Sequence, residues 1–316
     1  MSQPTPPEDD ALLRLAHAIE ATGYRFITPT PATHARVNAR PENAWARDLR
    51  DVFGWSRPFR PDVLPPAVFL LMQQAGVAEP RGDGGWGSLV RLSTLQNLVF
   101  LHSAYPTTAA DAVFFGPDTY RFARAIAALL ARPDTRARRA VDIGCGAGPG
   151  AVLLARARPG AEVLAVDVNK AALRLTLLNA ALAGVSVAAR RSDLLRDVEG
   201  SFDLIVGNPP YLVDPGARAY RHGGGPLGAG LSLDIVQAAC DRLAPGGTLL
   251  LYTGVAVVNG EDPFLAAAES QLASRHLDWT YEEVDPDVFG EELAEEAYRT
   301  ADRIAAVVLT ARKKNR

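Results

Sequence analysis

Near the middle of the chain, Asn208-Pro209-Pro210-Tyr211 combines a side-chain amide with two prolines and an aromatic ring. The motif follows a short apolar run at 202–206, so we expect it at the carboxyl end of a β-strand, where open α/β sheets bind ligands. The Asn208 side-chain oxygen and the Pro209 carbonyl can each accept one N–H of a planar amide or amine. The prolines stiffen the backbone, and Tyr211 can stack on the planar group. The motif therefore predicts a site that orients a planar nitrogen.

A glycine-rich segment, residues 141–150, forms a second candidate site. A predicted strand delivers Asp142, small residues turn the chain, and a helix begins near Pro149. Glycines permit a close ligand approach and positive φ angles, and the helix N-terminus favours a carboxylate or phosphate. The candidate binding residues of the turn are Asp142, Gly144, Cys145, Gly146 and Gly148, and Asn208 is a further candidate contact to the same ligand. A tight strand–helix turn without a ligand is the alternative.

Two further acidic positions follow predicted strands. Asp167 can accept hydrogen bonds from both hydroxyls of an adenosine-type ribose, with Val168 beside it in the same site. Asn169 can cap the next helix, which leaves Asp167 free for the ligand. Asp193, followed by Leu194, can face an adenine amino group, although a solvated loop acid explains it nearly as well.

Short β-branched runs and longer Ala/Leu-rich runs alternate from residue 139 onward. We expect strands at 140–143, 163–166, 185–189, 202–206, 248–252, 277–284 and 304–309, and helices at 149–158, 169–183, 230–243 and 262–274. This alternation implies right-handed crossovers and a mostly parallel sheet, with an antiparallel edge strand after the link at 285–302. The expected fold class is α/β: a Rossmann-like, seven-stranded, mostly parallel sheet with helices on both faces.

From about Phe114 onward, the chain resembles the class I S-adenosylmethionine-dependent methyltransferases that carry an Asn-Pro-Pro-Tyr motif. This branch includes release-factor glutamine N5-methyltransferases and N6-adenine methyltransferases. The resemblance implies that S-adenosylmethionine is the cofactor, with its methionine part at the glycine turn and its ribose at Asp167. It also implies that residues 208–211 bind the acceptor nitrogen, with no metal required. Residues 114–119 are similar in placement to a segment which that family packs over the methionyl end.

The resemblance favours a protein glutamine amide as the methyl acceptor, as in a release-factor-like substrate. Residues 221–231 are similar to the glycine-rich stretch that follows the motif in glutamine methyltransferases, at the place of a substrate lid. An ordinary disordered loop is the alternative, and His222 is expected to be solvated rather than a proton acceptor. Adenine N6 of rRNA, tRNA or DNA, and the nitrogen of a small molecule, remain alternative acceptors.

The first 112 residues have an irregular pattern and lack the regular alternation of apolar runs seen from residue 139 onward. We expect a disordered tail at 1–10, a mainly helical substrate-recognition or dimerisation domain at 11–112, and the methyltransferase domain at 113–316. Helices are expected at 12–21, 41–53, 65–75 and 118–131, and a strand-like run at 88–92 completes a winged-helix-like module. Residues 102–106 form a polar-aromatic stretch that either contacts substrate or packs the two domains together.

Composition narrows the class of protein. The 316 residues are 48% hydrophobic and 22% charged, a globular profile, and the formal net charge is −3. No global positive field attracts nucleic acid, so a nucleic-acid partner is less favoured than a protein. Two cysteines, one of them in the glycine turn, fit a reducing compartment. Without a signal-peptide pattern or a long apolar run, the sequence predicts a cytoplasmic protein with no membrane partner, and it leaves the oligomeric state open.

Overall fold

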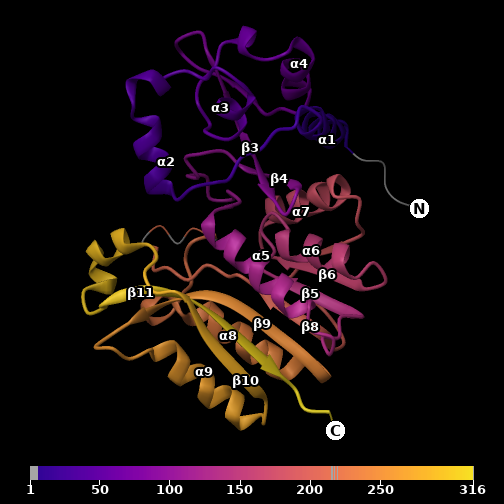
Figure 1. Ribbon diagram of the computed structural model, residues 1–316, viewed down its shortest axis with the longest axis vertical. Helices are drawn as coiled ribbons and strands as arrows, with labels where there is room; N and C mark the ends of the chain where they lie inside the picture. The colour runs from indigo at the N-terminus through magenta and orange to yellow at the C-terminus, as the bar shows by residue number, and fades with distance from the viewer. Residues whose placement is uncertain (1–5, 215, 217, 219, 316) are drawn as a thin grey trace.

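The computed structural model describes residues 6–214, 216, 218 and 220–315. Its first hundred residues form helices and two small hairpins, drawn in indigo and violet in Figure 1. The α-helices are α1 (Pro7–Glu20), α2 (Pro31–Asn38), α3 (Leu49–Phe53) and α4 (Pro66–Gln74). The hairpins pair β1 (Ala78–Pro80) with β2 (Trp86–Ser88), and β3 (Val90–Leu95) with β4 (Leu98–Ser103).

Two expectations for this region are wrong. Residues 7–10, predicted as part of a disordered tail, form the first turn of α1, while residues 1–5 lie outside the described part. Proline is tolerated at this position, acidic side chains favour a helix N-terminus, and Asp9 pairs with Arg174 at 2.5 Å. The helix expected over 41–53 is broken into a 3₁₀ turn and α3, because the Asp48 side chain accepts a hydrogen bond from the Asp51 N–H and starts a new helix.

The segment after α4 contains more strand than the sequence indicated. Gly76 ends the helix with a φ of +67°, and the β1–β2 hairpin follows at once. The single strand expected over 88–92 is divided between β2 and β3. A helix followed by a hairpin is the order that the winged-helix-like prediction requires, and that assignment stays a prediction.

The rest of the chain forms the expected α/β fold, with seven strands in the order β10-β11-β9-β8-β5-β6-β7. The strands are β5 (Arg139–Ile143), β6 (Glu162–Asp167), β7 (Ala188–Arg191), β8 (Phe202–Gly207), β9 (Leu243–Val257), β10 (Asp278–Asp285) and β11 (Arg303–Arg312). Pairing is parallel from β9 through β8, β5 and β6 to β7, and β11 runs antiparallel to both of its neighbours. A Rossmann-like, mostly parallel sheet is therefore confirmed.

The two strands joined by residues 285–302 pair antiparallel, as expected, but the strand that runs against the parallel ones is not at the edge. β11 lies between β9 and β10, and β10 forms the edge. The burial pattern explains the order, because the residues of β11 from Ile304 to Leu309 are all buried, whereas β10 exposes Asp278, Glu282 and Glu283. A strand with a continuous apolar run suits an interior position, and charged residues suit an edge.

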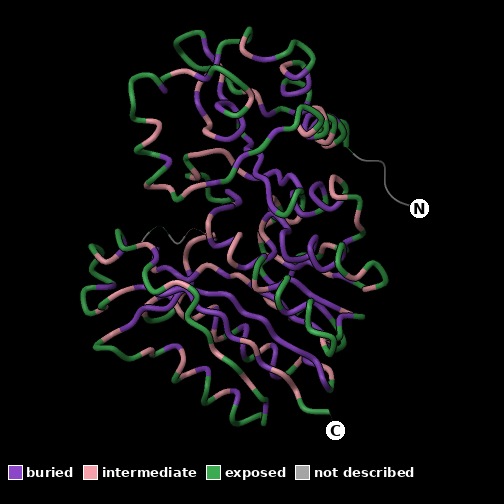
Figure 2. The backbone as a smooth tube through the Cα atoms, in the orientation of Figure 1, coloured by how far each residue is buried: buried purple, intermediate pink, exposed green. Residues whose placement is uncertain are grey.

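Helices cover both faces of the sheet (Figure 1). The helices are α5 (Pro117–Leu130), α6 (Pro149–Ala157), α7 (Lys170–Leu182), α8 (Gly230–Arg242) and α9 (Pro263–Ser274). One apolar cluster joins α8 and α9 to their face of the sheet. The other joins α5, α6 and α7 to the opposite face and continues into α1, α4 and the β3–β4 hairpin. Figure 2 shows buried residues, in purple, in both parts.

Asn179 of α7 links the hairpin to the sheet by hydrogen bonds. Its side-chain oxygen accepts from the Leu101 N–H at 2.8 Å, and its amide donates to the Leu101 and Ala147 carbonyls at 2.9 and 2.8 Å. All polar atoms of this fully buried amide are satisfied, as a buried polar group requires. The first hundred residues are therefore attached to the glycine turn through a single side chain as well as through the core. No helix in the described residues is long and apolar enough to cross a membrane.

Candidate active site

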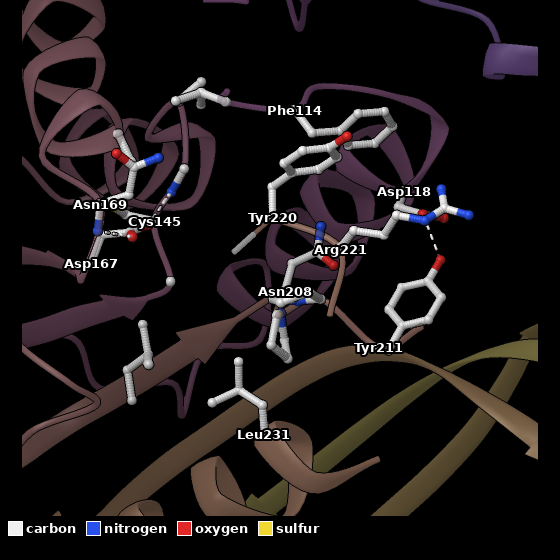
Figure 3. A pocket seen from close by; sticks show the side chains of 18 of the residues that line it. Phe114, Asp118, Cys145, Asp167, Asn169, Asn208, Tyr211, Tyr220, Arg221 and Leu231 are labelled. Carbon is white, nitrogen blue, oxygen red and sulfur yellow. Dashed lines mark hydrogen bonds between the residues drawn. The ribbon is translucent and has the colours of Figure 1, made fainter. Parts of the chain in front are cut away.

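A cavity of about 370 Å³ opens at the carboxyl ends of β5, β6 and β8, the edge where parallel sheets bind ligands (Figure 3). The structure brings nearly all of the predicted site residues to its wall: Asp142, Gly144, Cys145, Gly146, Asp167, Val168, Asp193, Leu194, Asn208, Pro209, Pro210 and Tyr211. Segments up to 69 residues apart in sequence therefore meet around one space, as strand topology predicts for strand-end positions.

The glycine turn leaves room for a ligand at two of its positions. Gly144 and Gly146 have φ angles of +68° and +54°, and a Cβ atom on Gly144 would have no protein atom within 4 Å. Gly148 differs, because a Cβ there would lie 2.8 Å from the Thr176 side chain, and Gly148 does not line the cavity. In the structure Gly148 lets α6 begin against α7, and its contact with a ligand stays a prediction.

Asp142 lines the cavity, but its carboxylate is turned toward the protein. Oδ2 accepts a hydrogen bond from the Ala151 N–H at 2.9 Å, at the first turn of α6. Burial raises the pKa of Asp142 to about 7. A Cβ on Gly150 would lie 2.6 Å from the same carboxylate oxygen. Asp142 therefore fixes the turn that forms the cavity floor rather than reaching across the cavity.

Asp167 keeps acceptor capacity for a ligand. Its Oδ1 accepts from the Asn169 N–H at 2.9 Å and its Oδ2 from the Gly146 N–H at 3.1 Å, so each oxygen retains a second lone pair. Burial raises its pKa. Asn169 caps α7 by accepting from the Ala171 N–H, as expected. Beside Asp167, the Val168 side chain is 49% exposed and supplies apolar surface for a flat ring.

Asp193 fits the alternative interpretation better. Its side chain is 51% exposed and forms an ion pair with Arg196, three residues further along. Leu194, which has a φ of +52°, lines the cavity next to it. The geometry therefore favours a solvated loop acid at Asp193, with the loop rather than the carboxylate forming the wall.

At the other end of the cavity, the Asn208 amide is available to a ligand. Within the described part of the chain, its side chain forms no hydrogen bond with protein, although it lines the cavity between Pro209 and the end of β8. Figure 3 shows Asn208 at the cavity centre, between the glycine-turn side and the Tyr211 side. An unsatisfied amide at this place is suited to receiving the N–H group of a second molecule.

Tyr211 does not present an open ring for stacking, contrary to our expectation. Its side chain is only 6% exposed, and its hydroxyl donates to Asp118 Oδ2 at 2.6 Å. The ring packs so closely on Gly254 that any Cβ there would overlap it. Tyr211 thus anchors the motif to the sheet and to α5. Aromatic surface comes instead from Phe114 and Tyr220, whose rings lie nearly parallel at 6.2 Å, and the sequence argument missed Tyr220.

Asp118 at the start of α5 holds this end of the site together, a role that the sequence did not assign to it, although it placed Asp118 at a helix start and within the segment 114–119. Its Oδ1 accepts from the Tyr252 hydroxyl at 2.7 Å, while Oδ2 accepts from Tyr211. Arg121 donates to Asp118 at 3.1 Å and to Asp285 at 2.6 Å. Asp118 is 6% exposed, so these donors compensate a buried charge. The signal that could have identified it is its place in the segment 114–119.

The glycine-rich segment after the motif is neither a free lid nor an ordinary open loop in the structure. The Gly223 N–H donates to the Leu212 carbonyl at 2.8 Å, and the Leu231 N–H to the Gly223 carbonyl at 2.7 Å. A Cβ on Gly223 would lie 2.7 Å from the Tyr211 Cα atom, and one on Gly228 would overlap the Tyr211 carbonyl oxygen. The segment therefore packs directly on the backbone of the motif.

His222 belongs to the same packed segment. Its Nδ1 accepts a hydrogen bond from the Asp214 N–H at 3.2 Å. Asp214 also accepts from the Arg218 backbone N–H and side-chain Nε, both at 2.9 Å, and the Arg218 side chain lowers the pKa of Asp214 to about 2. His222 is half-buried at the cavity wall rather than fully solvated, and its Nδ1 is already used.

Replacing Gly228 with alanine is expected to lower methyl transfer at least about 100-fold, since displacing reacting groups by 1 Å can cost that much. Gly228 has a φ of +80°, and the new Cβ would push against the Tyr211 carbonyl. Steady-state rates and calorimetric binding of S-adenosylmethionine would measure the change, with Gly184→Ala, which also has a positive φ but open space, as control. A normal rate in Gly228→Ala with an intact thermal unfolding profile would contradict the packing argument.

Comparisons with known proteins support both the α/β fold and a methyltransferase site. Residues 120–258 match the family model of the methyltransferase small domain. A solved transferase structure from Pyrococcus horikoshii shares the fold with a TM-score of 0.50 and 14% identity, over 90% of this chain and 100% of that one. This likeness covers the fold alone.

Sequence relatives specify the class further. The release factor glutamine methyltransferase of Koribacter versatilis is 30% identical over 56% of this chain and 68% of the relative. That of Deinococcus radiodurans is 36% identical over 49% of this chain and 55% of the relative. A 4-amino-L-phenylalanine/4-methylamino-L-phenylalanine methyltransferase of Streptomyces pristinaespiralis is 35% identical over 44% and 52%. The chain spans about half to two thirds of the length of these relatives. It belongs to the class I S-adenosylmethionine-dependent methyltransferases, in the branch that contains the release factor glutamine methyltransferases.

The cavity fits S-adenosylmethionine, the cofactor of this family. The open space over Gly144 and Gly146 can receive the methionine part, and the free lone pairs of Asp167 can accept the ribose hydroxyls. The exposed Val168 side chain and Leu194 offer an apolar surface for the adenine ring. The volume lies within the range of small-molecule sites.

Changing Asp167 to alanine is expected to weaken S-adenosylmethionine binding roughly 10- to 100-fold, the loss of one or two hydrogen bonds to a charged acceptor. Isothermal titration calorimetry of the purified protein measures this affinity. Asp197→Ala, an exposed acidic position outside the cavity, is the matched control. If Asp167→Ala binds the cofactor as tightly as the control variant, Asp167 does not hold the ribose.

Proposed function

We propose that the protein transfers the methyl group of S-adenosylmethionine to a planar nitrogen, and that this nitrogen is the side-chain amide of a protein glutamine. The observation that carries the proposal is the free Asn208 amide beside the Pro209 carbonyl, in the same cavity as the glycine turn. Bound S-adenosylmethionine supplies a methyl group already activated by its sulfonium. The acceptor site has to position the nitrogen and stabilise the charge that develops on it.

Asn208 and Pro209 would perform both tasks. The side-chain oxygen of Asn208 and the carbonyl of Pro209 each accept one N–H of the acceptor, which leaves the nitrogen lone pair directed at the methyl group. Both oxygens carry partial negative charge, so they stabilise a nitrogen that becomes more positive as its bond to the methyl carbon forms. The bond from that carbon to sulfur breaks, S-adenosylhomocysteine leaves as a neutral thioether, and the methylated nitrogen releases one of its N–H protons to water. The prolines and the packed glycine segment hold these oxygens in place before the acceptor arrives.

The aromatic pair of Phe114 and Tyr220 lies beside this position and can cover the flat face of an amide. The Tyr220 hydroxyl donates to the Thr107 carbonyl at 2.5 Å, which fixes its ring. Pro31, from the start of α2, also lines the cavity. We therefore also propose that residues 11–112 help to recognise the acceptor.

A glutamine acceptor is supported by the relatives named release factor glutamine methyltransferases. The second candidate is the nitrogen of a small aromatic amine. It is supported by the relative named for 4-amino-L-phenylalanine and by the parallel rings of Phe114 and Tyr220. The net charge of −3 argues against an adenine of nucleic acid, since phosphate binding relies on positive charge.

The test is methyl transfer from radiolabelled S-adenosylmethionine to a cell lysate, with wild-type protein and with Asn208→Ala in parallel. For a protein acceptor, the label should be lost from the large-molecule fraction after protease and remain after nuclease, and peptide mass spectrometry should place the methyl group on glutamine. Label in a filterable product would support the small-molecule candidate. Label that disappears with nuclease, or equal labelling by both variants, would overturn the proposal.

A further inference from the structure

A second, much smaller cavity lies on the other side of Phe114. It is enclosed by the β3–β4 hairpin, the start of α2 and the segment that follows β4. Pro31 and Phe114 line both this space and the large cavity, so the two are neighbours. Tyr105 and Thr107, which are half-buried, form its rim, and the sequence argument had left their segment undecided between substrate contact and packing.

Arg91 of β3 extends its side chain into this small cavity, although it is only 4% exposed. Its Nε donates to the Gly54 carbonyl at 3.0 Å, and its Nη2 lies 3.5 Å from His34 Nδ1. Guanidinium has five N–H donors, and these are the two hydrogen bonds that the described residues provide; its carbon also lies 5.7 Å from the centroid of the Phe26 ring. No carboxylate pairs with it among them.

A comparison within the same region shows how unusual this is. Arg57 is buried to the same degree, with 3% exposure, but it pairs with Asp51 at 2.5 Å. Burying a cation without a counter-charge lowers stability, because water solvates the ion better than the protein interior does. Arg57 therefore has a carboxylate partner within the protein, whereas Arg91 has only a carbonyl, an imidazole and an aromatic ring among the described residues.

The other titratable groups around the small cavity do not balance the charge. Burial and the nearby Arg91 lower the pKa of His34 to about 4, and the same causes lower that of His102. Both imidazoles are therefore neutral near pH 7. Burial lowers the pKa of Arg91 to about 10, which still leaves it protonated. The cavity thus presents one uncompensated positive charge, surrounded by neutral polar groups.

We propose that this small cavity is a carboxylate subsite, and that the carboxylate belongs to the molecule that accepts the methyl group. A carboxylate pairs with a guanidinium through charge-assisted hydrogen bonds, and one water-sized carboxylate oxygen fits a space of about 10 Å³. The shared walls at Pro31 and Phe114 place this charge beside the acceptor end of the large cavity. The second half of the inference rests on the proposed methyl transfer to a planar nitrogen.

The same chemistry has two sources. An acidic side chain close to a glutamine in a protein would provide the carboxylate, and so would the carboxyl group of a free amino-acid-like amine. Either acceptor would place its nitrogen at Asn208 and its negative charge at Arg91. An acceptor without a carboxylate would leave Arg91 uncompensated and would gain nothing from it.

The first experiment measures carboxylate binding without needing the acceptor. Thermal unfolding is recorded at increasing concentrations of sodium acetate. Acetate replaces a bulky morpholine sulfonate, so that the ionic strength stays constant. We expect acetate to raise the melting temperature of the wild-type protein, because a ligand that binds the folded state stabilises it. Arg91→Met should lose this acetate-dependent rise, and Arg57→Met should keep it even though its starting stability is lower.

Arg91→Lys protects the test against misfolding, because it keeps the charge but loses the planar fork, and it should bind acetate at least about tenfold more weakly. Absence of an acetate effect in the wild-type protein, or an equal effect in Arg91→Met or Arg91→Lys, would overturn the subsite.

The second experiment separates this inference from the proposed function. Acetate is added to the lysate methylation assay, and we expect it to raise the apparent KM for the acceptor fraction without changing S-adenosylmethionine affinity. If acetate binds at Arg91 but does not compete with the acceptor, the acceptor half of the inference is wrong while methyl transfer stands. If Asn208→Ala methylates normally, the proposed function fails while acetate binding at Arg91 is still measured.

The source of the carboxylate is read from the labelled product. Labelled peptides that carry an acidic residue near the methylated glutamine identify a protein source. A labelled filterable amine with a free carboxyl group identifies a small molecule. A labelled product with no carboxylate near the methylated nitrogen would overturn the acceptor half of the inference.

Discussion

Asn208→Ala is expected to reduce methyl transfer by about 100- to 1,000-fold, the range found when one polar group that stabilises a transition state is removed. The variant loses the oxygen that accepts an N–H of the acceptor, and the change does not touch the cofactor contacts at Gly144 or Asp167. Affinity for S-adenosylmethionine, measured by calorimetry, should therefore stay within about threefold of the wild-type value. The binding free energy would then change by less than the roughly 1.4 kcal/mol that a tenfold loss of affinity represents.

Asn208→Asp sharpens this test, because a carboxylate of the same size still accepts hydrogen bonds. It should retain clearly more activity than Asn208→Ala. Asn315→Ala, at an exposed position outside the cavity, controls for the loss of an amide elsewhere. Full turnover in Asn208→Ala would show that the acceptor nitrogen is held by other groups.

The second large effect is expected at Asp118. In Asp118→Ala, the hydroxyls of Tyr211 and Tyr252 lose their shared acceptor in a buried environment. Arg121 keeps only its partner Asp285. We expect the free energy of unfolding to fall by about 2–4 kcal/mol, since breaking a buried charge network leaves its remaining members unpaired. Urea unfolding at neutral pH measures this loss.

Activity of the Asp118 variants distinguishes positioning from general stability. Asp118 lines the cavity and anchors Tyr211, so Asp118→Asn, which keeps the shape and one accepting oxygen, should recover part of both stability and kcat. Cofactor affinity should change little in either variant. Asp278→Ala, an exposed acidic position on the edge strand, is the control. If Asp118→Ala unfolds like the wild-type protein, the network contributes nothing to the site.

The sequence was sufficient to bring most of the site together because strand ends obey a topological rule. Asp142, Asp167 and Asn208 each follow a short apolar run, and parallel strands put their carboxyl ends on one edge. The rule predicts which residues meet, but it does not predict where their side chains point. Asp142 is turned into the protein by the N–H of Ala151, nine residues further on, and Tyr211 is held by Asp118, which lies 93 residues away in the sequence.

Features that depend on packing between remote segments were not predictable in this way. The ring of Tyr220 meets Phe114 across more than a hundred residues. Gly228 is required by the Tyr211 carbonyl, a contact that composition cannot distinguish from loop flexibility. The position of β11 inside the sheet follows from its greater burial relative to β10, which only the packed structure shows. Pro7 and Asp48 are local signals for the start of a helix, and both were present in the sequence. The expectation of a disordered terminus hid the first, and the expectation of one continuous helix over 41–53 hid the second.

The hydrogen bonds of Asn179 have a consequence for protein engineering. This one amide joins Leu101 of the hairpin to Ala147 of the glycine turn, within an apolar core common to both parts. Exchanging the first 112 residues for those of another methyltransferase would break these bonds and expose the core at the same time. Redirecting the enzyme to new acceptors should therefore proceed by point changes at residues such as Pro31 or Arg91, with chimeras expected to yield insoluble protein.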